Sequence, residues 1–174
     1  GYAQESGIPY SDGLVKNRYV GRTFIEPDQR FRELGVKMKF NPLPDALNNK
    51  RVIVVDDSIV RGTTLKKSII KMMDRLKPKR IVVVSSAPQI RFPDCYGIDM
   101  ARIEDFVAFK AALELLKETN QYHVIDDVYK KCKSQEHLED KDVKNFVKEV
   151  YAPFSYEAVS QKIAELLSDE TVNA

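Results

Sequence analysis

The run from Arg51 to Thr64 constrains the fold of this chain more than any other segment. It reads Arg-Val-Ile-Val-Val-Asp-Asp-Ser-Ile-Val-Arg-Gly-Thr-Thr. Its apolar residues 52–55 predict a short strand that is buried on both faces, as in a parallel sheet. Two adjacent carboxylates, Asp56 and Asp57, end this strand, and a loop rich in small and hydroxyl residues follows as far as Thr64.

An amphipathic stretch comes after this loop and predicts a helix. Its apolar face contains Leu65, Ile69, Met73 and Leu76. The order strand, loop, helix presents backbone N–H groups and a helix N-terminus to a phosphate. The two carboxylates beside the loop can accept hydrogen bonds from sugar hydroxyls or hold a magnesium ion.

Simpler interpretations compete with a ligand site. Aspartates at the end of a strand often begin a turn or cap the next helix. Response-regulator receivers also carry paired acidic residues near a strand end, so the strand and the acidic pair alone are ambiguous. A Walker A loop is excluded, because the chain contains no Gly-x-x-x-x-Gly-Lys-Ser/Thr.

The complete string of residues 54–64 distinguishes between these interpretations. This segment resembles the phosphoribosyl pyrophosphate (PRPP) loop of type I phosphoribosyltransferases. Its exact sequence, Val-Val-Asp-Asp-Ser-Ile-Val-Arg-Gly-Thr-Thr, resembles that of the glutamine PRPP amidotransferases within this family. Residues 13–25 are similar to the start of the flexible loop in the same family, and residues 86–100 to its signature after the following strand. The three segments lie in the family's order, and the resemblance covers about residues 1–118.

The resemblance implies an α/β fold, with a type I phosphoribosyltransferase-like parallel sheet flanked by helices. Residues 1–119 are expected to form this core, with a flexible loop at about 19–49 and the PRPP loop at 56–64. Residues 120–174 are expected to contribute an edge strand and a C-terminal helical extension. Because the chain enters the family pattern part-way at Gly1, we expect the N-terminal part of the fold and the glutaminase domain to be missing.

Local signals add detail to this division. A helix should end near Gly7, and a short strand should follow a turn at Asp12. A second apolar strand at 79–86 predicts a right-handed strand–helix–strand connection. A helix is predicted at 102–119, with a core stripe of Phe106, Phe109, Leu113 and Leu116.

The last third of the chain lies beyond the resemblance, and its elements are predicted from local patterns alone. Residues 122–125 predict the edge strand, and the second acidic pair, Asp126 and Asp127, fits the first turn of a helix but lacks the Gly-Thr-Thr loop. Ser155 is predicted to cap a last amphipathic helix. That helix packs either on this domain or on a partner subunit.

Composition limits the class of protein. A chain with 43% hydrophobic and 31% charged residues is typical of soluble globular domains, and a net charge of +2 gives no argument for nucleic-acid binding. No apolar run reaches the roughly 18 residues of a membrane span. Cys95 and Cys132 are far apart, which indicates half-buried thiols in a reducing, cytoplasmic compartment, without a disulfide or an iron–sulfur cluster.

The chemistry of PRPP assigns expected roles. Displacing pyrophosphate needs no protein nucleophile, but it needs an anchored phosphate, held hydroxyls and neutralised charge on the leaving group. The resemblance implies that Asp56 and Asp57 contact the ribose hydroxyls and position Mg²⁺. Arg22 and Lys39 join them as catalytic candidates. The loop residues that would bind the substrate are Ser58, Ile59, Val60, Arg61, Gly62, Thr63 and Thr64.

The same resemblance implies a function and partners. Tyr19, Arg22 and Ile25 are expected in a mobile loop that shields the site and lines an ammonia channel. The chain would then be the phosphoribosyltransferase part of an enzyme that converts PRPP and glutamine-derived ammonia to phosphoribosylamine and pyrophosphate. Purine nucleotides are expected inhibitors, and a homo-oligomer is expected. The alternatives are a base-salvage phosphoribosyltransferase and a non-catalytic PRPP- or nucleotide-binding module.

Overall fold

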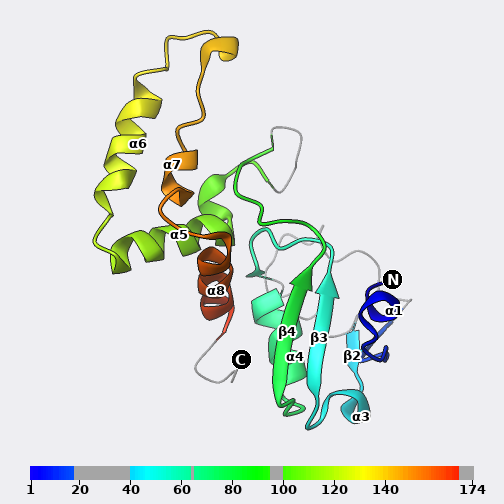
Figure 1. Ribbon diagram of the computed structural model, residues 1–174. Coiled ribbons are helices and arrows are strands. Elements are labelled where there is room, and N and C mark those ends of the chain that lie inside the picture. Colours follow the sequence, from blue (N-terminus) through cyan, green and yellow to red (C-terminus); the bar gives the residue numbers. More distant parts are fainter. Residues whose placement is uncertain (18–39, 64, 95–99, 169–174) are drawn as a thin grey trace. The chain divides into compact units, whose positions relative to one another are not determined.

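The computed structural model describes residues 1–17, 40–63, 65–94 and 100–168 (Figure 1). The chain forms two compact units. The first is built mainly from Gly1–Asp56 and Thr63–Val84, and the second from Asp57–Gly62 and Ser85–Asp169. The boundary predicted after residue 119 falls inside the second of these units, which contains the helices on both sides of that position.

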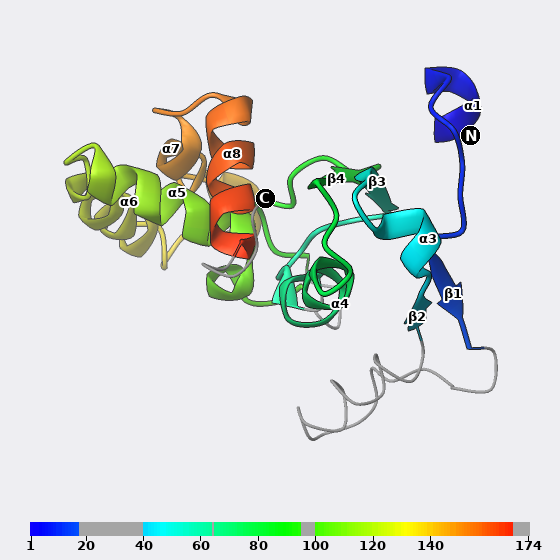
Figure 2. The same ribbon diagram turned by 90° about the horizontal axis from the view of Figure 1, so that it is seen from below.

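The first unit begins with a short helix and a strand pair. Helix α1 (Tyr2–Ser6) ends at Gly7, whose φ of 69° is left-handed, as the sequence predicted for a helix end. Strand β1 (Leu14–Lys16) pairs antiparallel with β2 (Phe40–Pro42), with Val15 opposite Asn41 (Figure 2). The strand predicted after Asp12 is therefore confirmed.

The flexible loop predicted at about 19–49 extends too far along the chain. Residues 40–42 form β2, and helix α3 (Pro44–Leu47) follows with a proline in its first turn. Leu47 is fully buried. Elements of three and four residues are too short to show periodicity, so the segment resembled a loop. Residues 18–39 lie outside the described residues.

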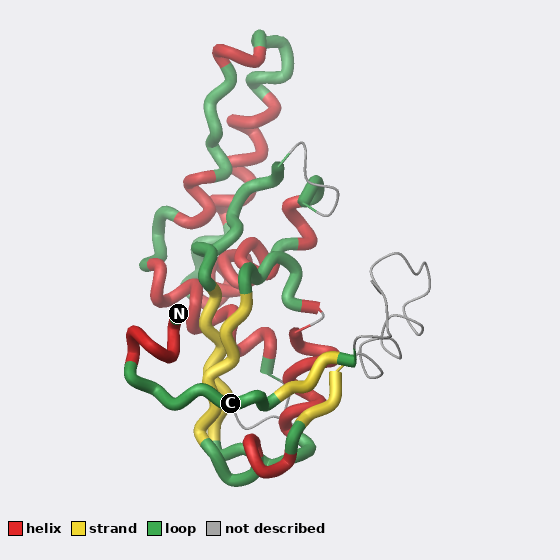
Figure 3. Tube along the Cα trace, turned by 90° about the vertical axis from the view of Figure 1, so that its right-hand side faces the viewer, coloured by secondary structure: helices red, strands yellow, loops and turns green. Residues whose placement is uncertain are grey.

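Strands β3 (Arg51–Asp56) and β4 (Arg80–Ser85) lie side by side and run in the same direction (Figures 1 and 3). At their beginnings, the Lys79 amide donates to the Lys50 carbonyl at 2.8 Å. The predicted parallel strand–helix–strand unit is confirmed, and with it the α/β fold class. The prediction of burial on both faces is wrong for β3, because Val55 is 52% exposed. A sheet of two strands leaves much of its surface in solvent.

The connection between these strands is helical but not a regular α-helix. It consists of a π-helical segment, η2 (Leu65–Ile70), followed by α4 (Lys71–Asp74). The wider turn of a π-helix changes which side chains face inward. Leu65 and Met73 are buried as predicted, but Ser68 and Ile70 are buried in place of Ile69 and Leu76.

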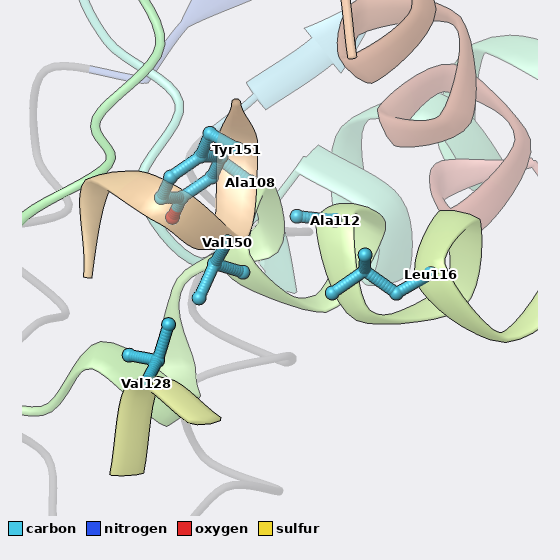
Figure 4. Packing of buried hydrophobic residues seen from close by; sticks show 6 residues of the cluster. All are labelled: Ala108, Ala112, Leu116, Val128, Val150 and Tyr151. Atoms are coloured by element: carbon cyan, nitrogen blue, oxygen red, sulfur yellow. The ribbon is translucent and has the colours of Figure 1, made fainter. Parts of the chain in front are cut away.

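The second unit is mainly helical. Its longer helices are α5 (Val107–Glu118), α6 (His123–Lys133) and α8 (Tyr156–Leu167), accompanied by the short segments η3 (Ile103–Asp105), η4 (Asp140–Asp142) and α7 (Lys148–Tyr151). A core cluster links α5, α6 and α7 through Ala108, Ala112, Leu116, Val128, Val150 and Tyr151 (Figure 4). Of the stripe predicted on α5 and just before it, Phe106 and Leu116 are fully buried, whereas Phe109 and Leu113 are half-buried.

The edge strand predicted at residues 122–125 is wrong, because α6 begins at His123. Val124, Val128 and Cys132 recur every four residues and all pack in the core cluster. That spacing belongs to a helix, and a four-residue β-branched run could not reveal it. Asp126 lies in the first turn of α6, as predicted. Cys132 is half-buried, as expected, and Cys95 lies outside the described residues.

The last helix packs on its own chain. Ser155 caps α8 as predicted, with its hydroxyl accepting from the Ala158 amide at 3.0 Å. Val159 is fully buried, and the Lys162 ammonium donates to Glu118 of α5 at 2.8 Å. In the part of the chain that the structure describes, no helix is long and apolar enough to cross a membrane.

Tyr151 makes the second unit sensitive to alkaline pH. Its hydroxyl donates to the Arg91 carbonyl at 3.0 Å, and burial raises the pKa of Tyr151 to about 12, although the nearby Arg91 guanidinium lowers it in part. An unfolded tyrosine ionises near pH 10, so this burial stabilises the fold fully below pH 10 and its contribution is lost as the pH rises towards 12. Between pH 9 and 11 we expect the wild type to lose about 1 kcal/mol more unfolding free energy than Tyr151→Phe.

Urea denaturation at both pH values measures this difference. Tyr129→Phe is the matched control, since that phenol is 62% exposed. Equal pH slopes for the wild type and Tyr151→Phe would contradict the prediction.

Candidate phosphate-binding site

The segment that follows β3, Asp57–Gly62, forms a loop in the second unit. Its first residue is fixed by the segment after β4. The Asp57 carbonyl accepts from the Ala87 amide at 2.9 Å and from the Ser86 hydroxyl at 3.1 Å. The Asp57 carboxylate in turn accepts from the Ser58 amide at 2.8 Å.

The far end of the loop is fixed by the start of α5. The Val60 carbonyl accepts from the Val107 amide at 2.9 Å. Arg61 and Asp105 form an ion pair at 3.3 Å. The carbonyls of Asp57 and Val60 therefore both accept hydrogen bonds from donors outside the loop.

Gly62 ends the loop in a conformation that favours glycine. Its φ is +68°, a left-handed value that costs a residue with a side chain about 1–2 kcal/mol. A Cβ atom at this position would lie 2.5 Å from Cδ2 of Leu167, the last residue of α8. The dihedral angle therefore favours glycine here, and a side chain at this position would force the end of the Leu167 side chain to shift.

The predicted site residues are distributed as follows. Asp56 ends β3 in the first unit and is half-buried, whereas Asp57 is exposed in the second. The next three residues, Ser58, Ile59 and Val60, are half-buried, and Arg61 is exposed. Thr63 is also exposed, and it belongs to the first unit. Thr64 lies outside the described residues, as do Tyr19, Arg22, Ile25 and Lys39.

The carboxylates of Asp56 and Asp57 bear on the expected Mg²⁺ site. Magnesium usually keeps several waters and binds through one or two carboxylates together with substrate phosphates. Asp56 and Asp57 supply carboxylates of that kind. Among the described residues, no group of three or more His, Cys, Asp or Glu could hold a metal ion alone. The residues present therefore fit an ion that arrives with a phosphorylated substrate rather than one held in a protein cage.

Several residues that shape the loop were missed by the sequence analysis. Ser86, Ala87, Val107 and Leu167 come from segments that are far from residue 57 along the chain. Of these, only Ser86 had a local signal, a hydroxyl placed directly after a strand. The other contacts are tertiary and leave no pattern in the sequence.

Comparison with known proteins identifies relatives. No protein-family model matches the chain. The curated amidophosphoribosyltransferase of Synechocystis sp. is 47% identical over 118 residues, which are 68% of this chain and 24% of the relative. That of Methanocaldococcus jannaschii is 50% identical over 108 residues, 62% of this chain and 23% of the relative. A solved structure, glutamine PRPP amidotransferase from B. subtilis complexed with ADP and GMP, is 32% identical, with a TM-score of 0.48, and the match covers 98% of this chain and 32% of that one.

The chain thus spans about a quarter of the length of the curated relatives it matches. An identity of 47–50% over more than a hundred residues confirms the resemblance that the three motifs indicated. This chain is similar in sequence to part of the amidophosphoribosyltransferases.

Proposed function

We propose that this chain is the phosphoribosyltransferase part of an amidophosphoribosyltransferase. It would bind PRPP at residues 56–64 and transfer the phosphoribosyl group to ammonia, which a complete enzyme takes from glutamine in the first step of purine synthesis. The observation that carries the proposal is the Asp57–Gly62 loop, which directly follows β3 and is held at both ends. It lies in a chain that is 47% identical, over 118 residues, to part of such an enzyme.

The loop would anchor the substrate. Backbone N–H groups of the loop after Ser58, whose own amide donates to the Asp57 carboxylate, would bind the 5-phosphate together with the hydroxyls of Ser58, Thr63 and Thr64. Asp56 and Asp57 would accept hydrogen bonds from the ribose 2- and 3-hydroxyls. Their negative charge would also stabilise a transition state in which positive charge develops on the sugar.

The reaction itself is a displacement at the anomeric carbon. The ammonia nitrogen forms a bond to C1 while the bond from C1 to the pyrophosphate oxygen breaks, and the nitrogen then loses a proton. Magnesium bound with the substrate would neutralise charge on the leaving pyrophosphate. Arg22 and Lys39 are proposed to assist it, with Tyr19, Arg22 and Ile25 in a loop that excludes water and admits ammonia.

Partners and location follow from the same proposal. A glutaminase domain would supply ammonia, and purine nucleotides would compete with PRPP because they carry the same 5-phosphoribosyl group. A homo-oligomer remains a prediction from the family resemblance. The two widely separated cysteines support a reducing, cytoplasmic location.

The test combines binding with turnover. Thermal unfolding is followed with PRPP and Mg²⁺, and with AMP and GMP, alongside an assay of ammonia-dependent pyrophosphate release. A ligand at a hundred times its Kd stabilises the folded state by about 2.7 kcal/mol, which such a scan detects easily. Stabilisation with pyrophosphate release supports the proposal. No response to any phosphoribosyl ligand would refute it.

Two other outcomes identify the alternatives. Stabilisation without turnover would indicate a PRPP-binding module, a function that the described loop supports by itself. Turnover with a purine or pyrimidine base in place of ammonia would indicate a salvage enzyme. The Ile-Val-Arg sequence at 59–61 favours the amidotransferase over that second alternative.

A further inference from the structure

Gly62, the last residue of the loop, is in contact with the end of α8. The Leu167 side chain is only 7% exposed, and its Cδ2 atom would lie 2.5 Å from a Cβ at residue 62. The Leu167 methyl group therefore fills the space that a side chain on residue 62 would occupy. A glycine in a loop has more accessible conformations than any other residue, so a close neighbour restricts it strongly.

Helix α8 is in turn held by the segment after β4. The Gln89 amide donates to the Tyr156 hydroxyl at 2.8 Å. The Gln89 side-chain Nε2 donates to the Tyr156 carbonyl at 2.8 Å and to the Ser160 hydroxyl at 2.7 Å. Three hydrogen bonds from one residue therefore fix the first turns of α8.

The same segment fixes the other end of the loop. Ala87, two residues before Gln89, donates its amide to the Asp57 carbonyl at 2.9 Å. Residues 85–91 thus hold the first residue of the loop directly and hold its last residue through α8. The Lys162–Glu118 pair adds a tie between α8 and α5, whose Val107 amide bonds the Val60 carbonyl.

We propose that α8 supports the phosphate loop and that Leu167 is a positioning residue for phosphate binding. The proposal deepens the proposed function, on which the identity of the ligand rests. Leu167 acts through Gly62: it keeps Gly62 in its left-handed conformation, and with it the backbone N–H groups of residues 59–62. A loop that is ordered before binding avoids the cost of being ordered by the ligand.

The test compares variants of α8 in the intact chain. Leu167→Ala removes the contact with Gly62, Leu167→Met restores a long apolar side chain, and Ile163→Ala is the matched control. Ile163 lies one turn earlier on α8 and packs against the core cluster. Amide hydrogen exchange at residues 58–62 is measured without ligand, and PRPP affinity is measured by calorimetry with Mg²⁺.

The expected results separate positioning from stability. In Leu167→Ala, the rate of amide exchange at residues 58–62 should rise about tenfold. The Kd for PRPP should also rise about tenfold, because the ligand must then order the loop. Leu167→Met should return both to within about threefold of the wild type, as volume-conserving apolar exchanges usually do. Ile163→Ala should lower the Tm and change both less than about twofold. If Leu167→Ala does not fold, Leu167→Val replaces it with the same expected order.

The two readouts distinguish failure of the inference from failure of the function. Unchanged loop exchange in Leu167→Ala, or an equal rise in Ile163→Ala, would overturn the inference whether or not PRPP binds. A specific rise in loop exchange supports it even if the wild type binds no PRPP, a result that would refute only the proposed function.

Discussion

Replacing Gly62 with alanine is expected to destabilise the second unit and to abolish most PRPP binding. The left-handed φ of +68° costs about 1–2 kcal/mol for alanine. The new Cβ would also lie 2.5 Å from Cδ2 of the buried Leu167 side chain, which must therefore shift. Overpacking of this kind adds about 1–3 kcal/mol. Urea denaturation followed by circular dichroism measures the loss of stability, and calorimetry measures the loss of affinity.

The chain offers a control for the backbone effect alone. Gly7 has nearly the same φ, +69°, but a Cβ there would have nothing within 4 Å. Gly7→Ala should therefore show the cost of the dihedral angle without the clash, and Gly62→Ala should be clearly more destabilising. The double variant Gly62→Ala, Leu167→Ala lacks the clash. Its loss of unfolding free energy should therefore be smaller than the sum of the losses in the two single variants. Equal effects of Gly7→Ala and Gly62→Ala would show that Leu167 does not restrict the loop.

Asp57→Asn is expected to lower the affinity for PRPP about 10- to 100-fold, because a hydrogen bond to a charged group contributes about 1.5–3 kcal/mol. The fold should be preserved. The asparagine carbonyl oxygen can still accept from the Ser58 amide, which bonds the Asp57 carboxylate at 2.8 Å. The bonds to the Asp57 carbonyl involve the main chain and do not change. Calorimetric titration with PRPP and Mg²⁺ at fixed ionic strength gives the affinity, and thermal unfolding without ligand checks the fold.

The second acidic pair supplies the control for charge. Asp127→Asn makes the same change in net charge at an exposed position of α6. It should leave PRPP affinity unchanged within about twofold, since an exposed charge that makes no contact with the ligand is largely screened by solvent and salt. Wild-type affinity in Asp57→Asn, or an equal loss in Asp127→Asn, would remove Asp57 from the substrate site.

The elements predicted well from the sequence are those with strong local signals. Residues 52–55 and 81–84 are β-branched runs, each preceded by an arginine, and both are strands. Ser155 caps α8 because its hydroxyl reaches an amide three residues later, which is a local interaction. The order of strand, acidic pair and glycine loop could likewise be read directly, since each part involves neighbouring residues.

The errors arise where tertiary contacts decide the structure. Residues 122–125 favour a strand when taken alone, but Val124 packs with Val128 in the core and the chain is helical. Ser68 is buried because the helix after the loop is π-helical, a change of pitch that apolar spacing did not reveal. For the candidate site, the sequence predicted the loop itself, but not that Val107 and Leu167 fix its shape.

The contact between Gly62 and Leu167 also has a consequence for the order of folding. These residues are 105 positions apart in the sequence, whereas β3 and β4 begin 29 positions apart. Contacts between distant residues require closure of a long loop and slow the steps that depend on them. During synthesis, the parallel strand pair can therefore form while the phosphate loop still lacks its support. The contact between Gly62 and Leu167 can form only after α8 has left the ribosome, so in a chain that ends before residue 167 the loop at 57–62 would lack this support.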